Sequence, residues 1–181
     1  KHIQIQHGNL NIVGKGCLYE KEPYFSPIIL YGSATDQANY SVVTVGKNVT
    51  LKGWAGLFID NNNAAGNYGI VANVYGTLQG QKDTSGDGGS ALYVNGSIKN
   101  TIGNVPKITL DGAVLNNEAG TGIYLAGYAD TTMKNCTVTS SSEGSAGIEI
   151  RAGKLNIKDG TYTSAGEFKT SPNGNGTTVD G

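Results

Sequence analysis

The sequence predicts an all-β protein whose fold is a parallel β-helix of about six coils. Short runs alternate apolar and polar residues with a period of two, which is the period of a β-strand. A phrase of two such runs separated by a glycine-containing corner returns along the chain, and no run has the period of an amphipathic helix. A pair of short strands cannot bury its apolar side alone, so the copies must stack and cover one another.

The clearest copy of the repeat is GIEIRAGKLNIKDG at residues 147–160, where the apolar residues of each run alternate with polar ones. The other copies are looser. In the second, the chain leaves the pattern at 32–47 and continues through the apolar run 54–59; in the fourth, it leaves the pattern at 96–106. The coils are expected, in chain order, at residues 2–14, 27–59, 69–80, 90–112, 122–135 and 147–160.

Aligning the copies predicts two columns of polar or small residues along the stack. Outward positions of the second strand are expected to form a ladder of side-chain hydrogen bonds from coil to coil: Asn11, Thr50, Thr77, Thr109, Thr132 and Asn156. Two positions after the last inward residue stand amino acids that tolerate positive φ, which predicts a left-handed corner: Gly14, Gly53, Gly80, Gly112, Asn135 and Asp159.

The outward position of the first strand predicts an apolar stripe. In chain order it holds Gln4, Ile29, Val71, Tyr93, Tyr124 and Glu149. Coils about 4.8 Å apart would bring the Tyr93 and Tyr124 rings into contact. One interpretation is that a loop or a neighbouring chain covers the stripe. The other is a ligand-binding surface for a glycan, formed by Ile29, Val71, Tyr93 and Tyr124.

Composition and charge limit the partners. The net charge is -1 and 15 % of residues are charged, so we expect no nucleic acid partner, and no apolar run is long enough for membrane insertion. The chain starts and stops within the repeat, so we expect residues 1–181 to be a single β-helix domain excised from a longer protein, in which adjacent coils or domains cover the exposed strand edges. Cys17 and Cys136 fall about 19 Å apart in the stack, which predicts two free thiols.

The phrase GI-x-I-x-x-G-x-L-x-I-x-D-G resembles the right-handed parallel β-helix modules of large bacterial surface proteins, within the broad pectate-lyase-like superfamily. The resemblance covers nearly the whole chain. It implies a right-handed solenoid, an extracellular or cell-surface location, and a carbohydrate or host-surface ligand. Because that superfamily includes both enzymes and adhesins, the resemblance leaves function open.

Candidate chemistry is sparse. A glycoside hydrolase needs two carboxylates beside the scissile bond, and the acids Asp111, Glu149 and Asp159 fall at different column positions, so no catalytic set is assigned. Residues 83–88 have the oxygen spacing of half a calcium loop, with Asp83, Ser85 and Asp87 as ligands, but Val94 stands where the bidentate Glu belongs. The alternative is a glycine-rich turn without a metal, and no other cofactor is expected.

We therefore expect a non-catalytic module of a bacterial cell-surface protein, acting as an adhesin, a glycan-binding surface or a stalk. The alternative is a polysaccharide lyase or glycoside hydrolase of the β-helix type, or a fragment of one.

Overall fold

The computed structural model describes residues 2–31, 41–61, 69–82, 88–96, 105–142, 145–165, 169–170 and 177–180. Within them the regular structure consists of β-strands without a helix. The strands form three stacked sheets, two of seven strands and one of six, in which hydrogen-bonded neighbours run parallel. The predicted all-β parallel β-helix is confirmed.

Each of the first six coils contributes one strand to each sheet, in the order A, B, C, and the described part of a seventh adds β19 to sheet A and β20 to sheet B. Sheet A contains β1 (Ile3–Ile5), β4 (Ile28–Tyr31), β7 (Ala55–Asn61), β10 (Ser90–Gly96), β13 (Ile123–Leu125), β16 (Ile148–Ile150) and β19 (Lys169–Thr170). Sheet B contains β2 (Gly8–Ile12), β5 (Ser41–Val45), β8 (Ile70–Val74), β11 (Lys107–Asp111), β14 (Asp130–Lys134), β17 (Gly153–Ile157) and β20 (Thr177–Asp180). Sheet C contains β3 (Lys15–Tyr19), β6 (Asn48–Gly53), β9 (Thr77–Gly80), β12 (Val114–Asn117), β15 (Cys136–Ser140) and β18 (Gly160–Ser164).

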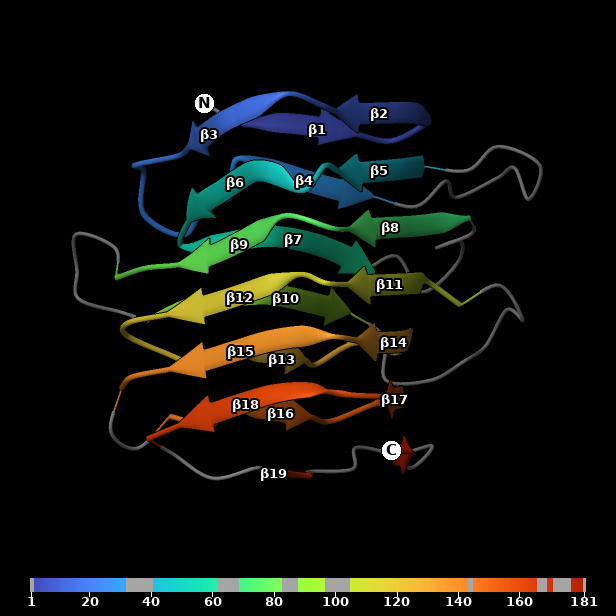
Figure 1. Ribbon diagram of the computed structural model, residues 1–181. Coiled ribbons are helices and arrows are strands. Elements are labelled where there is room, and N and C mark those ends of the chain that lie inside the picture. The colour runs from blue at the N-terminus through green and yellow to red at the C-terminus, as the bar shows by residue number, and fades with distance from the viewer. Residues whose placement is uncertain are drawn as a thin grey trace.

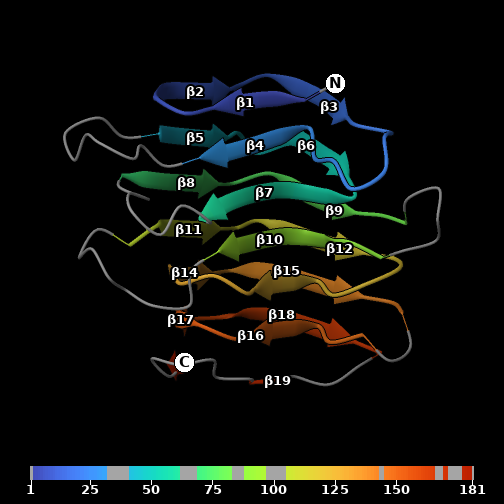
Figure 2. The ribbon, with the colours of Figure 1, turned by 180° about the vertical axis from the view of Figure 1, so that it is seen from behind.

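The coil is right-handed. In Figure 1 the strands of sheets B and C lie in front and run to the left, while those of sheet A lie behind and run to the right as the chain descends from β1 to β20. Figure 2 shows sheet A in front. Right-handed crossovers are the favoured connection between parallel strands, because the twist of the strands allows the chain to pack back onto the sheet only that way.

The core is a column of aliphatic side chains enclosed by the three sheets. Along sheet A, neighbouring coils place Leu57, Leu92 and Ile123 in register, and all three are fully buried. Burying one such side chain contributes roughly 1.5–3 kcal/mol. The first coil is covered on one side only among the described residues, so Ile3 and Leu18 remain 45 % and 37 % exposed.

The predicted division into coils is wrong in the second and third. Residues 54–59 do not close coil two; they include the start of β7, the first strand of coil three, which makes β8 a second strand rather than a first. The second strand of coil two is β5, inside the predicted detour. The strands of all three sheets alternate with the same period of two, so the sequence pattern does not distinguish the third strand of one coil from the first strand of the next.

Because two coils were divided wrongly, some residues predicted for the polar ladder and for the left-handed corner lie elsewhere in the structure. In sheet B a column of polar residues in register runs through Asn11, Thr44, Asn73, Thr109, Thr132 and Asn156. The hydrogen bonds between these side chains stay a prediction. Thr50 and Thr77, predicted in this ladder, pair with each other in sheet C.

Left-handed backbone is confirmed at the corners for Gly14 (φ 94°), Gly112 (φ 64°) and Asn135 (φ 52°). The prediction is wrong for Gly53 and Gly80, which are the last residues of β6 and β9 and pair with each other in sheet C. It is also wrong for Asp159, which lies at the expected corner but is not among the described residues with positive φ. Its carboxylate instead accepts a hydrogen bond from the backbone N–H of Asn135.

Both cysteines are free, as predicted. Cys136 is buried at the start of β15, and burial raises the pKa of its thiol. Cys17 is exposed in the first coil.

Candidate functional site

A groove of about 270 Å³ lies on the outer side of sheet A, beside the turns through which the chain passes from sheet C into sheet A. This sheet A groove combines four kinds of lining group. Trp54, Tyr93 and Tyr124 supply aromatic rings. Hydroxyl groups come from Thr121 and Ser145, a carboxylate from Glu149, and nearly bare backbone from Gly88, Gly89, Ala119 and Gly120. Ser90 also lines the groove, but it is only 3 % exposed and stands in register with the buried Ala55, so its hydroxyl is not counted among the open groups.

The rings belong to a continuous aromatic cluster. Phe58, Tyr93 and Tyr124 occupy one outward column on β7, β10 and β13. The Tyr93 ring centroid lies 5.0 Å from that of Tyr124 and 5.1 Å from that of Phe58, with interplanar angles of 68° and 60°. Trp54, from the turn before β7, places its ring 5.2 Å from Tyr93. The predicted contact of Tyr93 with Tyr124 is confirmed, and the rings meet edge to face rather than in a parallel stack.

The floor of the groove is open because its turns pack backbone against backbone. A Cβ atom on Gly88 would overlap the carbonyl of Ala119, and one on Gly120 would overlap the carbonyl oxygen of Gly89. A Cβ atom on Gly89 would overlap the carbonyl of Trp54. Glycine is therefore required for the close approach of three successive turns, and the space that side chains would fill remains part of the groove.

Asn117 is the last residue of β12, and its side chain is hydrogen-bonded to two of these turns. Its Nδ2 donates to the carbonyl oxygens of Gly89 (2.5 Å) and Thr121 (2.9 Å). Its Oδ1 accepts from the backbone N–H groups of Ala119 (3.0 Å) and Gly120 (3.1 Å). The side chain is 1 % exposed, so these bonds satisfy a buried amide.

The charged groups gather at the coil-six end of the groove. Glu149 follows Tyr124 in the outward column, and the Nη1 of Arg151 donates to the Tyr124 hydroxyl at 2.8 Å. That hydrogen bond, with the nearby Glu149, raises the pKa of the Arg151 guanidinium, which keeps it cationic. Burial raises the pKa of the Tyr93 phenol, and the neighbouring Tyr124 raises it further. The groove thus presents apolar ring surface, uncharged hydroxyls and one acceptor carboxylate.

The structure keeps part of the predicted ligand-binding set together. Tyr93 and Tyr124 both line the groove. Ile29 lies in the expected column but is only 4 % exposed, so its side chain cannot contribute to an open surface in this structure. Val71 is misplaced: it pairs with Val42 and Lys107 in sheet B, and its predicted place is taken by Phe58.

Two of the aromatic residues were missed by sequence reasoning. A signal for Phe58 was present, because the triplet Leu57-Phe58-Ile59 has the same form as Leu92-Tyr93-Val94, with an aromatic residue between two apolar ones. Trp54 lies in a turn, outside the alternating pattern, and carries no comparable signal.

The predicted calcium ligands Asp83, Ser85 and Asp87 lie outside the described residues. Within the part of the chain that is described, no group of three or more His, Cys, Asp or Glu side chains is placed to hold a metal ion.

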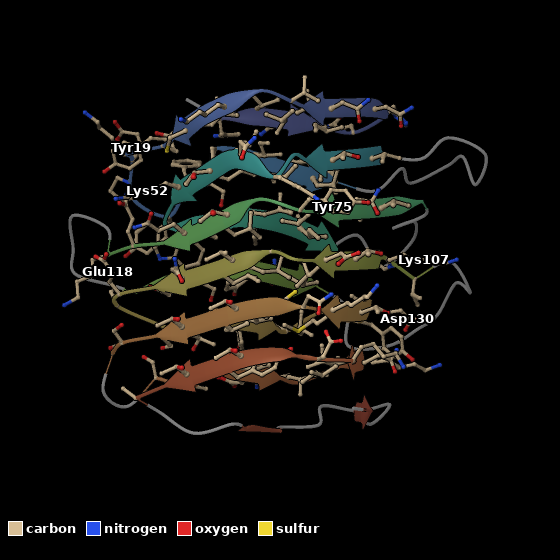
Figure 3. All side chains as sticks on the ribbon, viewed as in Figure 1. Tyr19, Lys52, Tyr75, Lys107, Glu118 and Asp130 are labelled. Atoms are coloured by element: carbon tan, nitrogen blue, oxygen red, sulfur yellow. The ribbon has the colours of Figure 1, made fainter. Side chains whose placement is uncertain are left out.

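A second hollow, of about 300 Å³, lies on sheet C and is lined by polar residues. Gln79, Asn116, Asn117, Glu118, Thr139 and Ser141 line it. Elsewhere on this sheet the Lys52 Nζ atom lies 5.3 Å from the centre of the Tyr19 ring, and Figure 3 shows both side chains at the same edge. This hollow offers no aromatic ring to a ligand, so the sheet A groove is the better candidate site.

No protein-family model, curated protein or solved structure matches the chain significantly. Among the described residues, no helix is long and apolar enough to cross a membrane.

Proposed function

We propose that this chain is a non-catalytic, glycan-binding module of an extracellular or cell-surface protein, and that the sheet A groove holds the carbohydrate. The observation that carries the proposal is the combination of three aromatic rings with two side-chain hydroxyls and a carboxylate in one groove. A pyranose ring has apolar C–H faces and a rim of hydroxyls, which matches such a lining.

The direction of the groove favours an extended ligand. Its lining residues come from the turn before β7 and from the three following coils, through Ser90, Thr121 and Ser145. Three steps of about 4.8 Å extend about 14 Å along the axis of the solenoid. A short oligosaccharide lying parallel to the axis would contact each level in turn, with the rings of Tyr93 and Tyr124 on one side and the bare turns on the other.

The resemblance to β-helix modules of bacterial surface proteins supports the same proposal, and we place the chain among them within the pectate-lyase-like superfamily. The enzyme alternative needs a second carboxylate facing the first across the ligand. Among the described residues that line the groove, Glu149 is the carboxylate present, so no observation favours hydrolysis.

Ligand binding to the groove can be followed by the fluorescence of Trp54. Trp54 is the single tryptophan of the sequence and lines the groove, so its fluorescence should change when a ligand enters. We propose screening the wild type on a glycan array and titrating the bound glycans by Trp54 fluorescence. Tyr93→Leu should weaken binding about tenfold, equivalent to about 1.4 kcal/mol. Leucine is chosen because alanine would also remove packing against three rings.

Tyr75→Leu is the matched control, because Tyr75 follows β8 on the opposite side of the solenoid from sheet A (Figure 3). It should bind as the wild type does. Absence of any bound glycan on a broad array, or equal binding by the Tyr93 and Tyr75 variants, would rule out this function for the groove.

A further inference from the structure

We infer that Asn117 is a positioning residue, which holds two successive turns together and thereby sets the shape of the sheet A groove. The inference concerns the architecture of the groove and stands whether or not its ligand is a glycan. Its consequence for affinity rests on the proposed function.

The first argument is the completeness of its hydrogen bonding. An asparagine side chain has two N–H donors and an oxygen with two lone pairs. Asn117 uses all four, toward Gly89 and Thr121 as donor and toward Ala119 and Gly120 as acceptor. A buried amide without partners would cost roughly 1–3 kcal/mol, so the side chain is committed to this arrangement of the turns.

The second argument is position. The column that contains Asn117 holds Gly53 and Gly80 in the two preceding coils and Ser140 in the next. Glycine has no group to bond a turn, whereas the Ser140 Oγ donates to the Gly120 carbonyl at 2.8 Å. The turn 118–121 is thus bonded from its own coil by Asn117 and from the following coil by Ser140. Ala119, Gly120 and Thr121 of this turn line the groove.

The third argument is the connection to the aromatic cluster. The Asn117 amide bonds the carbonyl of Gly89, and the adjacent Ser90 donates its backbone N–H to the Trp54 carbonyl at 3.2 Å. Gly89 itself packs against the Trp54 backbone too closely for a Cβ. Loss of the Asn117 bond would release the Gly89 turn, and the Trp54 environment would change with it. A groove held in its binding shape beforehand also reduces the ordering cost of binding.

The test compares Asn117→Asp and Asn117→Ala with Asn116→Ala, a change of the same residue type on the outward side of the same strand. The readouts are the emission maximum of Trp54 and its quenching by acrylamide, measured well below the melting temperature. Both Asn117 variants should show a red-shifted maximum and stronger quenching, and Asn116→Ala should match the wild type. If Asn117 only stabilised the fold, its variants would have a lower melting temperature, but the Trp54 emission and quenching of the folded protein would not change. That result would overturn the inference.

Asn117→Asp adds a pH readout. The carboxylate keeps the acceptor side but places negative charge against two carbonyl oxygens, and burial should raise its pKa. Below that pKa the protonated acid can again donate to one carbonyl. The Trp54 signal of this variant should therefore shift back toward that of the wild type at the same acidic pH, whereas Asn117→Ala should not recover. Recovery of neither or of both variants would contradict the donor role.

A measurement on the wild type covers the case in which the variants do not fold. The N–H groups of Ala119 and Gly120 lie in a turn yet donate to the buried Asn117 oxygen. In hydrogen exchange they should be protected as strongly as the amides of β12. Fast exchange at both would overturn the inference.

Discussion

Asn135 and Gly112 occupy equivalent corners between sheet B and sheet C, with φ values of 52° and 64°. The adjoining strands pair directly, Asp111 with Lys134 and Val114 with Thr137. Most side chains disfavour this left-handed region because the Cβ atom approaches the backbone, whereas asparagine enters it at low cost. At these corners the backbone conformation, rather than side-chain packing, therefore determines which residue types are tolerated.

Gly112→Val should lower the free energy of unfolding by about 1–3 kcal/mol, because a β-branched residue is strained at positive φ. Apart from Gly112 itself and its two chain neighbours, no described atom lies within 4 Å of a Cβ placed there, so the loss reflects backbone strain. Gly112→Asn should change stability little, as the natural Asn135 shows that the corner accepts it. Urea unfolding of the three proteins measures the difference, and a Val variant as stable as the wild type would show that the corner is not left-handed.

The individual strands are stable only as members of the stack. A strand of three to seven residues presents an alternating face, and its inward side chains need a neighbouring coil on each side for complete burial. The burial of one column shows this: Ile3 is 45 % exposed in the first coil, whereas Ile28, Leu57 and Leu92 below it are fully buried.

This gradient predicts unequal costs for the same kind of truncation. Leu92→Ala should lower the free energy of unfolding by about 2–5 kcal/mol, because it leaves a cavity between two covered coils. Ile3→Ala should cost about 1 kcal/mol or less, because its side chain is already half exposed to water. The comparison requires urea unfolding curves with equal slopes for both variants. Equal losses would mean that the outer side of coil one is covered in solution.

The whole molecule should become less stable in alkaline solution. Burial is the first cause that raises the pKa of Tyr31, Tyr93 and Tyr162 above the ordinary 10.0, and of Cys136 above the ordinary 9.0. Because each group loses its proton in the unfolded chain first, the unfolded state binds fewer protons as the pH rises past these ordinary values. Stability is then fully present below about pH 9 and falls as the pH rises through the higher pKa values of the folded protein.

Unfolding by urea at a series of pH values from neutral to about pH 11 would measure this decline. Tyr93→Phe is the matched variant, since it keeps the ring and removes one titrating phenol. Its stability should fall less steeply with pH than that of the wild type. A decline of the same steepness in both would show that Tyr93 does not contribute, and a flat profile in the wild type would contradict the prediction as a whole.

The class of fold and much of the core follow from local patterns in the amino-acid sequence. A period of two decides which side chains of a strand face inward, so Leu92, Ile123 and Ile148 could be assigned to the core from their own neighbours in the chain. The same local pattern placed Tyr93 and Tyr124 in one outward column. These properties depend on residues that are close in the sequence, so they do not require knowledge of which strands pair.

The sheet that each strand joins and the surroundings of the groove depend on contacts between coils and became known from the folded structure. Alternation is identical in all three sheets, so it could not distinguish β7 as a first strand or β8 as a second, and Phe58 and Val71 were exchanged as a result. The Trp54 ring contacts the ring of Tyr93, and the Asn117 side chain donates a hydrogen bond to Gly89. In each pair the two residues are far apart in the chain and meet only when the coils stack. The register of the strands depends on the pairing free energy of whole coils, including the effects of turn length and of the close glycine contacts. No short stretch of the sequence contains all of these contributions.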